Sequence, residues 1–351
     1  MTEPRFLVLR LGSLGDIVHT FPAVAALRKT FSDAEIVWLT HPRWKGLIES
    51  SGLCSQVWTI ETRALFSLRE IVTHVRKSYW DASIDYQGLW KSATLPFFGG
   101  VKRRIGFSSH TIREYGVPVL YTERVRATTT HIADQNGELS VRAGSRERAA
   151  CFSLHIPPHE EALVCSTLKA EGIDRYVMLS PGGGWRAKCW PPERFGLLCQ
   201  QIRESLGLRC IVNYGPGEED LVAAVRASSG DAEPLLHNSE LGQLMALLRG
   251  AACIVGGDTG PLHLAIALGT PAVALFGPTD PARNGPYHVA SRPIGAVGHW
   301  ESTTDGEKDI VLRADNTVTT HTRHDRSHPA MLAIDVESVF DAVWQQIGTI
   351  A

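Results

Sequence analysis

Long hydrophobic runs are missing from this 351-residue sequence, although 44% of its residues are hydrophobic. No apolar stretch reaches the roughly 20 residues that a membrane-spanning helix needs. Near the start of the chain, Arg10 interrupts the apolar stretch 6–9, which is too short for a secretory signal peptide. The sequence therefore predicts a globular protein rather than an integral membrane or secreted one.

The cysteines show no paired spacing of the kind that zinc sites and disulfide frameworks require. They are Cys54, Cys151, Cys165, Cys189, Cys199, Cys210 and Cys253. An odd and scattered set of seven is typical of a reducing compartment. We therefore expect a cytoplasmic protein without structural disulfides.

Two familiar nucleotide-binding patterns are also absent. The loop Gly12-Ser13-Leu14-Gly15 does not have its glycines in the order of the dinucleotide fingerprint, which disfavours a nicotinamide dehydrogenase. The loop 180–191 lacks Walker spacing, yet it places three glycines, Arg186 and Lys188 directly after a predicted strand. Such a loop is either a phosphate cradle or a flexible connection with surface cations, and its sequence favours neither.

What the chain does contain is a regular alternation of strands and helices. The first series of expected strands is 6–11, 35–40, 57–60, 82–86 and 105–107. After a break marked by Ile156-Pro157-Pro158, a second series comprises 176–180, 210–214, a short strand near 235, 253–255 and 272–276. This alternation predicts an α/β protein with two doubly wound parallel sheets. We expect domains over 1–165 and 170–333 and a final helix over 334–348.

Charge is distributed unevenly, although the net formal charge is only −2. Residues 1–150 contain 20 Lys+Arg and 14 Asp+Glu, a balance of +6. The remaining residues contain 15 and 23, a balance of −8. A basic first half indicates an anionic partner, either a small acid or a membrane surface, although ordinary surface variation is an alternative.

The stretch 253–281 predicts a buried strand, a turn, a helix and a second buried strand. Gly256 and Gly257 allow close approach to the backbone, and Asp258 and Thr259 suit a helix start. A helix that starts at the carboxyl end of a parallel strand is a potential anion site. His263, in the first helical turn, would add a hydrogen-bond donor. The alternative is a capped core helix with an incidental histidine.

Two further clusters follow predicted strands in the first half. Asp16 either caps its helix or acts as a proton acceptor. The segment 87–91 with Arg103, Arg104 and Arg113 forms either an anion pocket or a solvated basic face, and the second interpretation is favoured.

Four motifs together resemble the heptosyltransferases of lipopolysaccharide core synthesis, which form glycosyltransferase family nine. They are RLGSLGDIVHTFPAV (10–24), IDYQGLWKSA (84–93), Lys188-Cys189-Trp190-Pro191 and GGDTGPLHLAIALGTPAVALFGPTDP (256–281). The resemblance extends from residue 5 to about 290, and the last motif is the most specific. The segment QGLWKSA is most similar to the heptosyltransferase I branch, which adds the first heptose to Kdo.

The resemblance implies a glycosyltransferase-B fold, in which two Rossmann-like domains face each other across a cleft. The first domain would bind the acceptor and the second the nucleotide-sugar donor, while the final helix would return to pack on the first. The implied activity is inverting, metal-independent and cofactor-free transfer of heptose from ADP-heptose to the Kdo/inner-core region of lipopolysaccharide. The implied acceptor is an anionic lipopolysaccharide precursor at the inner-membrane surface, where the protein would associate peripherally, and nucleic acid is not a partner. Alternatives are transfer to another inner-core sugar or a protein hydroxyl, and nucleotide-sugar binding without turnover.

The resemblance also assigns roles by position. The implied catalytic residues are Asp16, as general base, and Lys188, which meets the charge of the leaving phosphate. The implied donor-binding residues are Gly183, Gly184, Lys188, Asp258, Thr259, Gly260 and His263. The implied acceptor-binding residues are Ser13, Lys91 and Arg113.

The sequence departs from the family pattern in the glycine loop. Gly183 and Gly184 stand where the first-heptose enzymes carry hydroxyl side chains, so phosphate binding there would use backbone N–H groups. His321, His324 and His328 have metal-like spacing, but Pro329 and the polar setting favour a solvated loop, and no metal site is predicted.

Overall fold

The computed structural model describes residues 3–61, 65–112, 114–289, 309–314, 317, 319–320 and 326–348. The chain divides into two compact units between His155 and Ile156, and each unit is described by itself. Within the described residues, no helix is both long and apolar enough to cross a membrane.

The first unit is built on a six-stranded parallel sheet. Its strands are β1 Arg5–Leu9, β2 Glu35–Thr40, β3 Gln56–Thr59, β4 Ala82–Asp85, β5 Arg104–Phe107 and β6 Glu123–Val125. Its helices and 3₁₀ turns are α1 Leu14–Val18, α2 Phe21–Thr30, η1 Pro42–Trp44, α3 Lys45–Ser50, α4 Leu65–Arg76, α5 Trp90–Phe98, η2 Val117–Leu120 and α6 Ile132–Ala143. The strand order is β3-β2-β1-β4-β5-β6, so the order reverses between β1 and β4.

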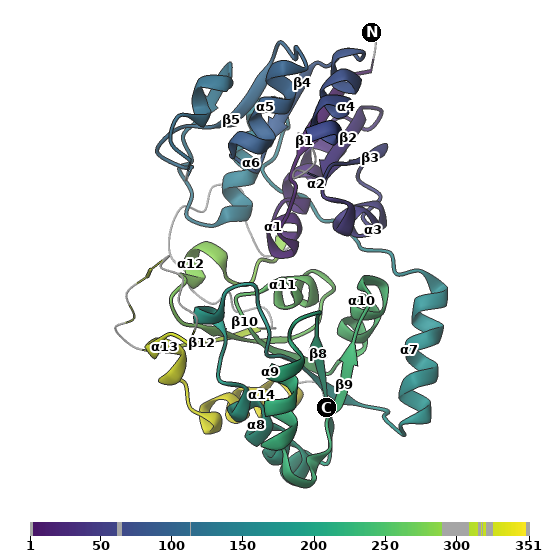
Figure 1. The fold of residues 1–351 in the computed structure, drawn as a ribbon, viewed down its shortest axis with the longest axis vertical. Coiled ribbons are helices and arrows are strands. Elements are labelled where there is room, and N and C mark those ends of the chain that lie inside the picture. The colour runs from purple at the N-terminus through teal and green to yellow at the C-terminus, as the bar shows by residue number, and fades with distance from the viewer. Residues whose placement is uncertain are drawn as a thin grey trace. The chain divides into compact units, whose positions relative to one another are not determined.

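Both faces of this sheet are covered by helices. On one face, Leu7 and Leu9 of β1 pack in a cluster with Val75 of α4 and Leu95 of α5. Figure 1 shows these two helices side by side. On the other face, α2 and α6 pack against each other and Phe21 of α2 contacts Trp38 of β2. Strands covered on both faces need apolar side chains in both directions, which explains the continuous apolar runs.

The second unit repeats the same topology. Its strands are β7 Tyr176–Ser180, β8 Arg209–Tyr214, β9 Leu235–Asn238, β10 Cys253–Gly257, β11 Ala272–Phe276 and β12 Asp309–Arg313. Its helices and 3₁₀ turns are α7 Pro158–Ala170, η3 Arg186–Lys188, α8 Pro192–Leu206, α9 Glu219–Ala227, η4 Gly230–Ala232, α10 Leu241–Gly250, α11 Gly260–Ala267, α12 Pro281–Asn284, α13 Pro329–Leu332 and α14 Val336–Gly348. The strand order is β12-β11-β10-β7-β8-β9, with its reversal between β7 and β10. The prediction of two doubly wound domains in tandem is confirmed.

The final helix corrects one prediction. The resemblance implied that it would pack on the first domain, whereas α14 packs on the second sheet, beside α8. Its apolar stripe, which includes Val339 and Val343, joins the cluster formed by Val255 of β10 and Val273 of β11. Burial of this stripe against the nearest apolar sheet face holds the helix there.

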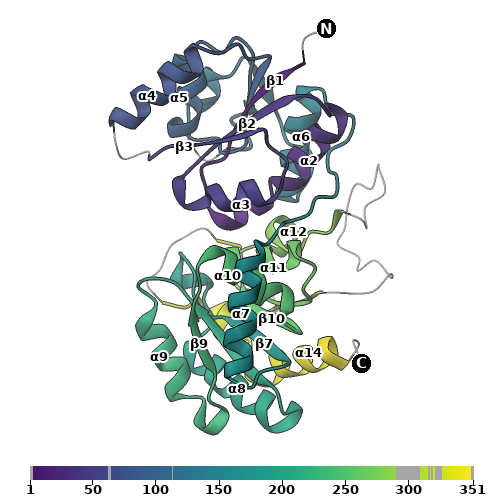
Figure 2. The same ribbon diagram turned by 90° about the vertical axis from the view of Figure 1, so that its right-hand side faces the viewer.

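The domain boundary also lies earlier than the sequence indicated. Residues 158–165 were assigned to the first domain, but they form the first part of α7, which packs against α10 in the second unit (Figure 2). Pro158 stands at the first position of α7, so the proline pair both ends the connection and starts a helix.

Candidate active site

In an open parallel sheet, ligands bind where the strand order reverses, at the carboxyl ends of the two central strands. In the second unit these strands are β7 and β10, and the loops after them carry the glycine-rich segment 181–188 and the turn 258–260. The topology therefore brings together two motifs that lie about 70 residues apart in the sequence.

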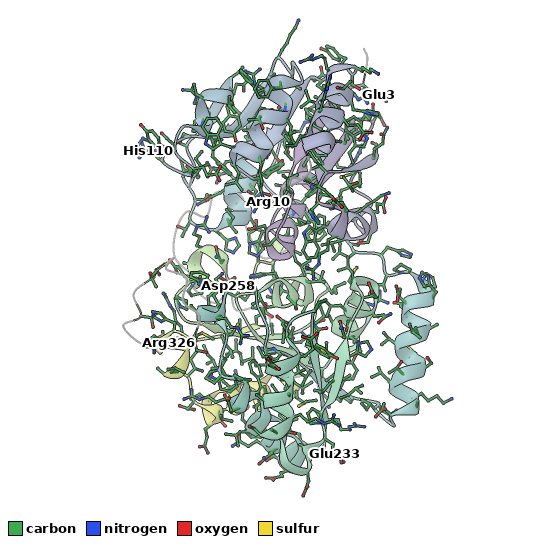
Figure 3. All side chains as sticks on the ribbon, viewed as in Figure 1. Glu3, Arg10, His110, Glu233, Asp258 and Arg326 are labelled. Atoms are coloured by element: carbon green, nitrogen blue, oxygen red, sulfur yellow. The ribbon has the colours of Figure 1, made fainter. Side chains whose placement is uncertain are left out.

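Asp258 connects the polar side chains at this point. One carboxylate oxygen, Oδ2, accepts a hydrogen bond from Lys188 Nζ at 2.6 Å, and Oδ1 lies 2.9 Å from His263 Nε2. Asn284 Nδ2 donates to Oδ2 as well, at 3.3 Å. Figure 3 marks Asp258 at the turn between β10 and α11. A buried carboxylate with these partners fixes the positions of both basic side chains.

The charge state of Asp258 follows from its surroundings. Burial by itself would raise the pKa of this carboxyl. The hydrogen bond with His263 and the Lys188 ammonium act more strongly in the opposite direction and hold the pKa of Asp258 well below its usual range. Asp258 is therefore ionised throughout the physiological pH range.

The start of α11 supplies backbone donors next to this cluster. Thr259 occupies the N-cap position in an extended conformation, and Pro261 lies in the first turn, where its missing N–H costs nothing. The Thr259 side chain makes no capping hydrogen bond. First-turn N–H groups and the positive end of the helix dipole make this terminus suited to an anion. His263 is buried in the same turn and directs Nε2 to Asp258.

The glycines of this region serve close packing within the chain. A Cβ on Gly257 would lie 2.6 Å from the Lys188 carbonyl oxygen, so its absence lets the turn η3 pack against β10. A Cβ on Gly183 would lie 2.8 Å from Thr259 Cγ2. Gly184, in contrast, is exposed and has open space around the Cβ position. Gly257 was expected to admit something close to the backbone, and the group that approaches is the chain's own carbonyl.

In the first unit, Asp16 lies where the strand order reverses between β1 and β4. Its Oδ2 accepts hydrogen bonds from the Ser13 backbone N at 3.0 Å and from Ser13 Oγ at 3.1 Å. Its Oδ1 forms an ion pair with Arg10 Nη2 at 2.9 Å. Asp16 thus has the contacts expected of a capping residue, and its side chain also remains 44% exposed. A capping carboxylate at the open edge of the sheet can still accept a proton from a ligand.

Arg10 was not predicted as a site residue, and Gln87 was considered only as part of the segment 87–91. Arg10 is buried at the end of β1, where Figure 3 marks it, and Nη1 donates to the Tyr86 carbonyl. Gln87 Oε1 accepts hydrogen bonds from the backbone N atoms of Leu11 at 2.9 Å and Gly12 at 3.3 Å. Both residues tie the loop that precedes α1 to the turn after β4. The position of Arg10, a charged residue directly after a buried strand, could have indicated a role at this edge of the sheet.

The turn after β4 is itself held by a buried carboxylate. Asp85 Oδ1 accepts from the backbone N atoms of Gln87 and Gly88, and Oδ2 accepts from Ser92 and Tyr121 hydroxyls. Burial raises the pKa of Asp85 despite these bonds. The motif segment 84–93 therefore has a clear structural role in shaping this edge of the sheet.

The remaining cations predicted to bind an anion differ in their surroundings. Lys91 is exposed in the first turn of α5. Arg113 lies outside the described residues. Arg103 and Arg104 are held by contacts within the first unit: Arg103 pairs with Glu123 at 2.7 Å, and Arg104 donates to backbone carbonyls of Leu120 and Val101.

The predicted histidine cluster is described only in part. His321 and His324 lie outside the described residues, and His328 caps α13, with Nδ1 accepting from the Ala330 backbone N at 3.2 Å. Within the ranges that the structure describes, no group of three or more His, Cys, Asp or Glu side chains is placed to hold a metal ion.

The known proteins to which this chain is similar include lipopolysaccharide heptosyltransferases. Lipopolysaccharide heptosyltransferase 1 of Escherichia coli K12 is 28% identical over 304 residues, which cover 81% of this chain and 91% of that protein. Lipopolysaccharide heptosyltransferase 3 of the same strain is 23% identical over 345 residues, which cover 93% of this chain and 94% of that protein.

Solved structures share the fold over the whole chain. A family 9 glycosyltransferase from Veillonella parvula has a TM-score of 0.80 at 20% identity, covering 99% of this chain and 98% of its own. The E. coli heptosyltransferase WaaC with ADP has a TM-score of 0.73 at 21% identity, covering 97% and 99%. The architecture is thus the glycosyltransferase-B fold. A family model described as glycosyltransferase family 9 (heptosyltransferase) matches residues 68–313, and the chain belongs to this family of glycosyltransferases.

Proposed function

We propose that this enzyme transfers heptose from ADP-heptose to the Kdo/inner-core region of lipopolysaccharide. The observation that carries the proposal is the cluster of Lys188, Asp258 and His263 beside the α11 N-terminus, which is suited to a diphosphate. Family membership supports the reaction class. One solved protein of the same fold, the E. coli heptosyltransferase WaaC, has been captured with ADP and with ADP-2-deoxy-2-fluoro heptose.

The donor would be held mainly by its diphosphate. The Lys188 side chain is partly exposed and its Nζ is bonded to Asp258, so a small rotation would let Nζ donate to a phosphate oxygen as well. The N–H groups at Gly260 and at the exposed Gly184 add neutral donors. Thr259, Gly183 and His263 would shape the turn around the phosphates. Because Lys188 bears a charge close to where the leaving group gains one, it would stabilise the transition state more than the bound donor.

Asp16 would act as the base in a single displacement. Its carboxylate would take the proton of an acceptor hydroxyl, the hydroxyl oxygen would form a bond to the anomeric carbon, and the bond from that carbon to the phosphate oxygen would break. The electron pair of that bond leaves with ADP, and the configuration at the anomeric carbon is inverted. We propose that Arg10 and Ser13 hold Asp16 in place, and that Lys188 performs the electrostatic role without a metal.

The acceptor would bind to the first unit. Ser13, Lys91 and Arg113 are the proposed contacts, since Kdo carries carboxylates that cations recognise. An acceptor of this kind is anchored in a membrane, so we propose a cytoplasmic enzyme that works at the inner-membrane surface. Similarity to a second type of lipopolysaccharide heptosyltransferase, heptosyltransferase 3, leads us to propose a second candidate acceptor, a core that already carries heptose.

A product assay would test the proposal. The enzyme is incubated with ADP-heptose and with either heptose-free or heptose-bearing lipopolysaccharide, and the product is analysed by mass and by NMR of the new linkage. Transfer to the heptose-free core with inverted configuration is the expected result. Transfer only to the heptose-bearing core would favour the second candidate, and ADP-heptose binding without a product from either acceptor would contradict the proposed activity.

A further inference from the structure

The helix α5 exposes an aromatic face that an ordinary surface helix would fill with polar residues. Trp90, Phe97 and Phe98 are 43%, 41% and 55% exposed, and their spacing of seven and eight residues places them on one side of the helix. The opposite side, which includes Leu95 and Pro96, is buried. The helix is therefore apolar on both sides, although only one side packs on its own unit.

The chain that follows β5 extends this face. The ring of Trp90 lies against the turn at Gly116, where a Cβ would be 3.1 Å from Trp90 Cζ2. Beside that glycine, Tyr115 is 95% exposed, and Val119 of η2 is 67% exposed. Val117 is buried in a cluster with Ala93 of α5, so this segment is fixed against the helix while its outer side chains face solvent.

Positive charge is concentrated in the same part of the chain. Residues 88–126 contain seven Lys+Arg and two Asp+Glu, a balance of +5 that accounts for most of the excess in the first half. One of the two acids, Glu123, is paired with Arg103 and Arg142. Lys102 is exposed close to the end of α5, and the Arg104 guanidinium lies 5.3 Å from the centre of the Phe97 ring.

We propose that this aromatic and basic surface, formed by Trp90, Phe97, Phe98, Lys102, Tyr115 and Val119, docks onto the anionic face of a lipid bilayer. Exposed aromatic side chains enter the interfacial region, while cations are attracted by anionic headgroups. A second copy of the chain fits this surface less well. In a symmetric contact, the face would meet its own excess of positive charge.

The surface adjoins the edge of the sheet that carries Asp16. The helix α5 begins three residues after Gln87, whose side chain binds the backbone of Leu11 and Gly12 in the loop before α1. Docking along α5 would therefore keep this edge close to the membrane. Vesicle binding requires neither substrate, so it is independent of the proposed transfer.

Vesicle sedimentation tests the inference. The full chain is mixed with vesicles of phosphatidylcholine alone or of phosphatidylcholine with phosphatidylglycerol, in the absence of substrates. We expect binding to the anionic vesicles that weakens as salt rises. The double variant Phe97→Ser/Phe98→Ser should lower the partition coefficient by about tenfold or more, because two aromatic side chains no longer enter the interface. Lys102→Glu, at an exposed position, should lower it by roughly fivefold or more.

Trp344→Ser provides the matched control, because Trp344 is a similarly exposed aromatic side chain on α14 in the second unit. Its partition coefficient should equal that of the unsubstituted protein, and thermal melts should confirm that all variants fold. Equal binding to neutral vesicles would overturn the inference, as would retained binding by both α5-surface variants. A dimer that the phenylalanine variant dissociates, or displacement of vesicles by an oligonucleotide, would assign the surface to another partner.

Discussion

Asp258 illustrates how a single buried carboxylate can organise a binding site. Burial of an ion is unfavourable unless partners compensate, and here Lys188 and His263 do so at 2.6 and 2.9 Å. The same contacts hold both basic groups in place before any ligand binds. The sequence allowed Lys188, Asp258 and His263 to be proposed individually. The contact between Lys188 and Asp258 follows from the strand order, which places β7 beside β10, and was not predictable from spacing.

Removing Lys188 tests the donor site. Lys188→Ala should lower kcat by roughly a hundredfold or more, on the scale of losing one preorganised donor to a developing negative charge. Steady-state kinetics with ADP-heptose measures the effect. Lys169→Ala, at an exposed lysine of α7, is the control and should turn over normally. Normal turnover by Lys188→Ala would show that the donor pocket lies elsewhere.

A substitution of Asp16 can distinguish a catalytic role of this residue from a capping role. Asp16→Asn keeps one of the two acceptor oxygens, enough for the bonds from Ser13 or for the bond from Arg10, but cannot take a proton. If Asp16 is the base, turnover should fall about a hundred- to ten-thousand-fold, with donor affinity nearly unchanged. If it only caps α1, asparagine is a comparable cap and the rate should survive. Turnover, donor affinity and melting temperature of the purified variant distinguish the two outcomes.

The ionised state of Asp258 should appear in the pH dependence of stability. Because its pKa in the folded protein is lower than in the unfolded chain, its contribution is present at neutral pH and is lost as pH falls below about 4. Asp258→Asn should therefore be less stable than the parent by about 2 kcal/mol or more at pH 7. This difference should shrink on acidification. Urea unfolding of both proteins from pH 7 to pH 3 provides the measurement, and a constant difference would contradict the assigned charge.

At the scale of elements, the sequence predicted the long apolar strands well and the short polar ones poorly. The β6 strand Glu123–Val125 and the β12 strand Asp309–Arg313 escaped prediction. Both contain charged residues and, among the described residues, lie at the end of a strand order with one neighbour each, so they lack the apolar pattern of a central strand. The packing of α14 was also missed, since its periodicity indicates an apolar stripe without indicating which sheet it covers.

Glycines at the end of β10 provide a test at this scale. Gly257→Ala introduces a Cβ about 2.6 Å from the Lys188 carbonyl oxygen, which must move η3 away from the strand. We expect a loss of about 1–3 kcal/mol in unfolding free energy, together with weaker ADP binding. Gly184→Ala meets open space, so its stability should change by less than about 0.5 kcal/mol. Similar unfolding curves for the two variants would contradict the packing account.

At the scale of the molecule, the two units repeat one topology and differ in charge. Their strand orders coincide once β7 is aligned with β1, so the predicted sites occupy equivalent positions after the first and fourth strands. This repetition explains why the motif positions could be found from the sequence. The supporting contacts of Arg10, Gln87 and Asp85 could not be found from the sequence. Arg10 and Gln87 have partners about 75 residues away, and the partners of Asp85 depend on the conformation of the local turn.

The proposed reaction moves heptose from ADP-heptose with charge stabilisation from this chain's own residues. The most direct test follows radiolabel from ADP-heptose into heptose-free lipopolysaccharide, with and without excess chelator. We expect time-dependent incorporation at the same rate in both samples, because Lys188 and the α11 N-terminus would meet the charge of the departing diphosphate. Absence of incorporation would contradict the proposed transfer, and activity that chelator abolishes and added divalent ions restore would contradict its mechanism.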